Sequence, residues 1–153
     1  LFFNLFPSTF EEFDSIFGYR GDQMGPLSDE YEQYIYLFIE AQNHIKESVY
    51  NNKLIEIAKD GIWDADAINL FQFCIVNFVI EDATNSQKSS FLESLSTYSE
   101  ADISNFWRFY FDDLYPDCYG EKYLKTMSAL QGYERLLIIM EKRYETICKN
   151  HNR

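Results

Sequence analysis

Apolar side chains recur at steps of three and four residues along most of this chain. One such run contains Tyr31, Tyr34, Ile35, Phe38 and Ile39. Steps of this size place side chains on one face of an α-helix, whereas a half-buried strand would alternate polar and apolar residues. The 153 residues also include only 6 Gly and 3 Pro, which is too few for the many tight turns of a β-sandwich or barrel. The pattern therefore predicts an all-α protein.

The spacing predicts a single domain over residues 1–153, built as an irregular bundle of about seven helices. A chain of this length buries roughly two thirds of the surface that it exposes when unfolded, so one core can form. The helix that follows Asp64 is apolar almost all round, and we expect it to be the central, most buried element. Residues 18–27, GYRGDQMGPL, are predicted to form a loop. Two helix starts are predicted, one at a capping box of Ser8 and Glu11 and one at a cap formed by Ser28. Two helices are predicted to end at Gly61 and at Pro116. The last helical segment is either one long helix or two helices joined at Gly132.

Two segments share one plan. Residues 63–73, WDADAINLFQF, and residues 99–109, SEADISNFWRF, both pass from polar residues into an aromatic run, and a short amphipathic segment precedes each. Side chains such as Asp64 and Ser99 cap helices by accepting hydrogen bonds from the free N–H groups of the first turn. The segments therefore predict two similar helical hairpins, which are too few for a solenoid. A metal at Asp64 and Asp66 is disfavoured, because a hard cation needs further oxygen ligands and the neighbouring sequence supplies none.

The formal charge of the chain is −12, from 25 acidic and 13 basic side chains. Such a field repels phosphate backbones and anionic lipid headgroups, so we expect neither nucleic acid nor membrane as a partner. The longest apolar stretch, INLFQFCIVNFVI, contains Asn and Gln and is too short to span a bilayer. Residues 121–153 are an exception, with an excess of basic side chains. These either pair with acidic neighbours within the chain or form a charge match between molecules.

The three cysteines, Cys74, Cys118 and Cys148, are far apart in the sequence and include no C-x-x-C pair. Their odd number and wide spacing indicate neither a disulfide framework nor a zinc site, and we expect a reducing, cytoplasmic environment. The sequence also lacks a phosphate-loop ending and a credible pairing of a nucleophile with a base. We therefore predict no catalytic residue, no metal ligand and no cofactor.

Glu40, His44 and Glu47 are the one cluster that combines carboxylates with an imidazole, and they share a face if a single helix carries them. They support one alternative function, a helical metal-binding protein or enzyme, although a di-iron or zinc site needs more histidines than this chain supplies. A second alternative is a small-ligand-binding domain with an apolar pocket among the Phe residues.

Acidic side chains alternate with tyrosines in residues 111–123, FDDLYPDCYGEKY, around a predicted helix break. Acidic groups beside amphipathic rings suit a surface that docks a basic protein, and an ordinary solvated loop is the other interpretation. The predicted partner-binding residues are Asp112, Asp113, Tyr115, Asp117, Tyr119 and Glu121.

The leading hypothesis is a non-enzymatic protein–protein interaction module. A small, acidic, helical chain rich in Tyr and Asp resembles bacterial immunity proteins, which neutralise toxins. The resemblance lies in composition alone, and it implies a basic toxin as the partner.

Overall fold

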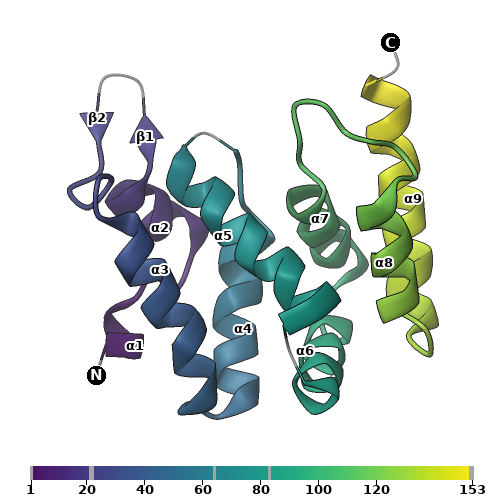
Figure 1. The fold of residues 1–153 in the computed structure, drawn as a ribbon, viewed down its shortest axis with the longest axis horizontal. Coiled ribbons are helices and arrows are strands. Elements are labelled where there is room, and N and C mark those ends of the chain that lie inside the picture. Colours follow the sequence, from purple (N-terminus) through teal and green to yellow (C-terminus); the bar gives the residue numbers. More distant parts are fainter. Residues whose placement is uncertain (1, 21–22, 64, 83, 152–153) are drawn as a thin grey trace.

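The computed structural model describes residues 2–20, 23–63, 65–82 and 84–151, and within them the fold is all-α, as predicted (Figure 1). Besides the α-helices it contains one 3₁₀-helix, one π-helix and a pair of two-residue strands. The α-helices of the described residues are α1 (Phe2–Leu5), α2 (Phe10–Phe17), α3 (Tyr31–Glu40), α4 (Glu47–Ala58), α5 (Asp66–Asn77), α6 (Asn85–Ser96), α7 (Glu100–Tyr110), α8 (Glu121–Ala129) and α9 (Glu134–His151). The other elements are η1 (Ala41–Asn43), η2 (Phe78–Asp82), β1 (Tyr19–Arg20) and β2 (Gln23–Met24).

The helices follow one another in chain order along the long axis, so that the two ends of the chain lie at opposite ends of the molecule (Figure 1). Helices two apart in the chain pack together. One row consists of α2, α4 and α6, and a second consists of α3, α5, α7 and α9. The predicted hairpins are α4–α5 and α6–α7, stacked on each other between two flanking helix pairs. This nearest-neighbour stacking is the arrangement of a short helical solenoid, although only the two inner hairpins share a sequence pattern.

Aromatic rings connect the stacked helices through the core. Phe71 on α5 is the junction: its ring centroid lies 5.1 Å from that of Phe13 on α2, 6.3 Å from that of Phe38 on α3 and 6.4 Å from that of Phe109 on α7. All four side chains are at most 1% exposed. Rings of this size dominate the apolar area that such a core removes from water.

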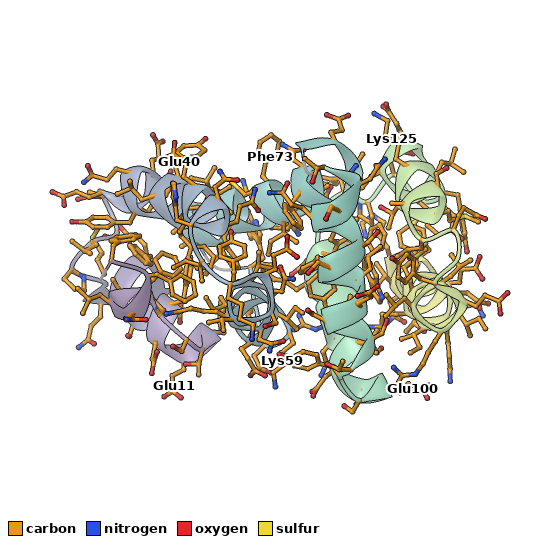
Figure 2. The ribbon with its side chains drawn as sticks, turned by 90° about the horizontal axis from the view of Figure 1, so that it is seen from below. Glu11, Glu40, Lys59, Phe73, Glu100 and Lys125 are labelled. Atoms are coloured by element: carbon orange, nitrogen blue, oxygen red, sulfur yellow. A yellow bond between two sulfur atoms is a disulfide. The ribbon has the colours of Figure 1, made fainter. Side chains whose placement is uncertain are left out.

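The prediction that the helix after Asp64 is the most buried element is wrong. Its face toward the core carries Ile68, Phe71 and Ile75, but Phe73 is 58% exposed and projects from the surface in Figure 2. No second layer of described helices covers that face. Five residues of α5 are buried, the same number as in α7, whereas α4 buries six.

Ser99 caps α7 as predicted, because its Oγ accepts a hydrogen bond of 3.2 Å from the N–H of Asp102. Asp64 lies outside the described residues, so its predicted role as a cap is not addressed. Ala65 occupies the cap position of α5 without a side-chain hydrogen bond, and Asp66 is the first helical residue.

Two predicted helix starts are wrong. At α2 the pairing is shifted by one residue: Thr9 Oγ1 accepts from the N–H of Glu12 at 3.2 Å, and Glu12 Oε2 accepts from the N–H of Ser8 at 2.8 Å. Ser28 does not cap α3, because its N–H donates to the carbonyl of Gly25 within a turn and α3 begins only at Tyr31. Several hydroxyl and carboxylate residues in a row leave the register of a cap undetermined by sequence.

One predicted helix end and one predicted loop differ from the structure, and the alternative left open for the last helix is settled. α7 ends at Tyr110, well before Pro116. The last helical segment is two helices, α8 and α9, separated at Gly132, whose φ of 89° favours glycine. The predicted loop after Gly18 contains a minimal antiparallel hairpin in which Tyr19 pairs with Met24.

Gly61 follows α4 and lies against the face of the Phe109 ring. A Cβ atom at Gly61 would meet Cδ2 of Phe109 at 2.3 Å and Cε2 at 2.6 Å, which is well inside van der Waals contact. The Gly61 carbonyl also accepts a hydrogen bond of 2.8 Å from Nη2 of Arg108. The absence of a side chain at residue 61 therefore allows the α4–α5 connection to cover α7.

Gly61→Ala should destabilise the protein by about 1–3 kcal/mol, because the added methyl overpacks the buried ring. Denaturant unfolding of the single variants and of the pair with Phe109→Leu measures the effect. The smaller side chain at residue 109 leaves space for the methyl, so the two costs should not add. Strictly additive costs would contradict a direct steric contact.

Candidate protein-interaction surface

The predicted partner-binding residues lie on one loop and on the first turn of α8. The α7–α8 loop, residues 111–120, carries most of them, and Glu121 is the first residue of α8. Asp112 is half-buried, and the other predicted side chains are exposed. At the tip of the loop Tyr115 is 83% exposed and its neighbour Leu114 is 64% exposed. The loop thus presents an aromatic ring and an aliphatic side chain to solvent, among carboxylates.

A disulfide between Cys118 and Cys148 attaches this loop to α9, with 5.9 Å between the two Cα atoms. This corrects the interpretation of the cysteines as unpaired. The bond joins residues 30 positions apart, and they meet because α8 and α9 fold back on each other. Linear spacing does not reveal such a long-range pairing. Cys74 is not part of a disulfide.

The hydroxyl of Tyr144 holds the same loop from α9. It accepts a hydrogen bond of 3.0 Å from the N–H of Tyr119 and donates one of 3.3 Å to the carbonyl of Asp117. Burial raises the pKa of this hydroxyl, so it stays protonated and can donate. The ring of Tyr144 also lies 4.6 Å from that of Phe111 and 4.5 Å from that of Tyr123, measured between centroids.

Tyr119 adopts a left-handed backbone conformation, with φ of 65°. For a residue other than glycine this conformation costs of order 1–2 kcal/mol, and it persists only where the surroundings determine it. Here the disulfide precedes the residue and the Tyr144 hydroxyl holds its N–H. The result is a ring that is 53% exposed, next to the carboxylates of the loop.

Lys122 lies beneath the loop. Its Nζ donates to the carbonyl of Tyr110 at 2.6 Å and lies 5.2 Å and 5.4 Å from the ring centroids of Tyr110 and Phe111. Burial lowers the pKa of the Lys122 amine to about 8, and the charges of Asp113 and Asp112 partly oppose this shift. The small crevice beside it, about 130 Å³, is also lined by Asp117 and Tyr144. The buried amine supports the backbone at the point where α7 ends.

The structure separates the residues of the metal-site alternative. Glu40 ends α3, His44 follows η1 and Glu47 begins α4, so the three do not share one helical face as predicted. The chain turns between the two helices, and Figure 2 shows Glu40 at the surface. In the part of the chain that is described, no group of three or more His, Cys, Asp or Glu side chains is placed to hold a metal ion.

The Phe residues of the small-ligand alternative pack against one another. Phe6 and Phe38 stack with centroids 4.2 Å apart, and Phe13 lies 5.0 Å from Phe17. These rings fill the space in which an apolar ligand was expected. A groove of about 310 Å³ instead opens at the surface beside the exposed Phe73, between α5 and α8.

No protein-family model, no curated protein and no solved structure matches this chain. Across the described ranges, no single helix has the length and apolar character needed to cross a membrane. The stretch Asp66–Glu81 and the helix Asn85–Ser96, which meet at 117°, satisfy that test only as a bent pair.

Loss of the Cys118–Cys148 bond should destabilise the fold by about 3–4 kcal/mol, because the unfolded chain regains the freedom of a loop of that length. Urea unfolding with and without reductant measures the loss, and Cys148→Ser should reproduce it without reductant. Cys74→Ser is the matched control and should leave the effect of reductant unchanged. Equal urea midpoints for the oxidised and reduced protein would contradict the prediction.

The Lys122 amine should titrate near pH 8 in the folded protein and near 10.5 when unfolded. The folded chain releases this proton at a lower pH, so the unfolded chain binds more protons between these values and stability rises with pH across that window. The ¹³Cε chemical shift of Lys122 reports the titration directly. Urea midpoints should rise between pH 8 and 10.5 in the parent protein relative to Lys122→Met. A ¹³Cε midpoint near 10.5 in the folded protein would refute this account.

Proposed function

We propose that this protein is a non-enzymatic interaction module that binds a basic protein partner through the α7–α8 loop and the start of α8. The observation that supports this most is the way the loop is held. A disulfide and a buried tyrosine hydroxyl hold its backbone, and the half-buried Lys122 donates to the last carbonyl of α7 just before it, while Tyr115 at its tip is exposed. An ordinary solvated loop does not need so many long-range attachments.

A loop fixed before binding suits a docking surface because little conformational entropy remains to be lost. Exposed Tyr side chains supply large contact areas at low entropic cost and are frequent among the residues that dominate binding energy. Tyr115 and Leu114 are the anchors that this surface offers, and Tyr119 lies nearby on the same loop. The partner should present an apolar depression of matching size.

The negative charge of this surface indicates which charges should surround the depression on the partner. Asp113, Asp117 and Glu121 are exposed around the tyrosines, in a chain with a net charge of −12. Complementary charges accelerate association and select among partners more than they add affinity. A partner with Lys and Arg around an apolar centre fits this pattern. A more specific proposal rests on the resemblance in composition: a bacterial immunity-type protein whose partner is a basic toxin.

A cytoplasmic location stays a prediction. It was expected because the cysteines were interpreted as unpaired, whereas Cys118 and Cys148 form a disulfide, which weakens that expectation. Disulfides persist chiefly in oxidising compartments. Because the shape of the α7–α8 loop depends on this bond, the proposed function favours a meeting with the partner in oxidising surroundings.

Binding assays against basic proteins encoded beside the gene for this chain test the proposal. Tyr115→Ala should weaken binding to such a partner by about 2 kcal/mol, or about 30-fold, because it removes the exposed anchor. Asp113→Asn combined with Asp117→Asn should slow association and reduce its dependence on salt.

Tyr36→Ala is the matched control, since Tyr36 lies on α3 toward the other end of the molecule and is 50% exposed. It should bind like the parent protein. The proposal fails if none of the neighbouring gene products binds, or if Tyr36→Ala weakens binding as much as Tyr115→Ala does.

A further inference from the structure

A groove of about 550 Å³ lies between α7 and α9, on residues other than those of the proposed docking surface. Glu100, at its edge, lies on the side of the molecule away from Lys125 in Figure 2. Ile139 contributes apolar surface. The polar side chains that line the groove are Glu100, Ser104, Asn105, Lys142, Arg143 and Thr146.

Arg143 is the unusual member of this set. It is half-buried, its Nε is shielded from solvent without a hydrogen-bond acceptor, and it forms no ion pair within the described part of the chain. A guanidinium carries five N–H donors and is always charged, so a shielded Nε–H without an acceptor costs free energy. The sequence offers 25 acidic side chains against 13 basic ones. In such an acidic protein an arginine without a carboxylate partner is unexpected.

The surroundings of Arg143 add positive charge. Burial first, and then the charge of Arg143, lowers the pKa of the Arg108 guanidinium, which shows that the two cations repel each other. Lys142 also lines the groove, and the one carboxylate there, Glu100, lies 4.0 Å from Lys142. That carboxylate is thus paired with Lys142 and not with Arg143. The groove keeps a local excess of positive charge.

Neutral donors line the same groove. Ser104 and Asn105 are half-buried on α7, and neither side chain makes a hydrogen bond within the described structure. Thr146 on α9 donates to the carbonyl of Lys142 at 3.2 Å. The other arginines of known placement donate to backbone carbonyls, as Arg108 does to Gly61 and Arg135 does to Ser96 and Tyr98. Arg143, Ser104 and Asn105 therefore combine unused donors from two facing helices.

We propose that the α7–α9 groove binds a small molecule through an oxyanion, either a phosphate or a carboxylate, with Arg143 as the principal ligand. The flat guanidinium matches both groups because it can donate two parallel hydrogen bonds to them. Ser104 and Asn105 supply further donors, and Lys142 adds charge. The groove has the volume of a small-molecule site, and Ile139 gives the rest of the ligand an apolar surface.

Titration of the folded protein with inorganic phosphate, and separately with succinate, tests this proposal at constant ionic strength. The Arg143 Nε–H signal and the backbone amides of Ser104 and Asn105 are followed by ¹H–¹⁵N NMR. We expect saturable shifts at millimolar concentrations with at least one anion, and the better anion identifies which oxyanion the groove prefers.

Arg143→Gln should weaken this binding at least about tenfold, since it removes the charge-assisted hydrogen bonds to the oxyanion. Arg135→Gln is the control and should leave the affinity unchanged. Arg143→Lys keeps the positive charge but cannot donate two parallel hydrogen bonds, so it should lose an intermediate amount of affinity. This second variant also tests the proposal if Arg143→Gln fails to fold. The proposal is wrong if neither anion gives saturable shifts, or if the affinity survives in the Arg143 variants. Neither result bears on the docking surface, which uses other residues.

Discussion

The contact of the Phe71 ring with its aromatic neighbours is the interaction on which the stacked architecture depends. Each helix pair is too short to bury its own apolar face, so neighbouring pairs must share a core. Phe71 on α5 connects Phe13 and Phe38 on one side with Phe109 on the other. Because rings extend farther than aliphatic side chains, a few of them span the distance between helix axes. The high aromatic content thus compensates for short helices.

Helical spacing predicted the all-α class and the two inner hairpins, but not which face of each helix is covered. Phe73 and Phe109 hold the same position in the repeated segments. Phe109 is 1% exposed because the backbone at Gly61 lies against it, whereas Phe73 is 58% exposed. The difference comes from a connection elsewhere in the chain. Helix caps were predicted with similarly mixed success. The cap of α7 at Ser99 was identified, while the capping box of Thr84 and Gln87 at the start of α6 was missed, because it lies in a run of polar residues.

The sequence predicted which residues form the candidate surface, but not the conformation of the loop that carries them. Alternating Asp and Tyr in residues 111–123 indicated a docking surface, and most of these side chains are exposed. Their backbone is held in place by contacts with α9, through Cys148 and Tyr144, which lie far along the chain. The buried amine of Lys122 is a similar case, because an isolated lysine in a sequence is normally expected in solvent. Long-range contacts of this kind leave no local pattern.

Helix α9 explains how two chemically opposite surfaces coexist on a small acidic protein. Adjacent residues of a helix point about 100° apart, so Tyr144 supports the acidic loop while Arg143 faces the groove beside α7. Pairing within the chain explains only part of the basic excess in residues 121–153. Lys149 pairs with Glu145, and Lys125 with Glu121, whereas Arg143 forms no ion pair with any described residue. The carboxylates concentrate on the α7–α8 loop, whereas Arg143 lies in the groove where α7 supplies neutral donors. The separation by helix face lets one helix support both the acidic loop proposed to bind a basic partner and the groove proposed to bind an oxyanion, without the opposite charges neutralising each other.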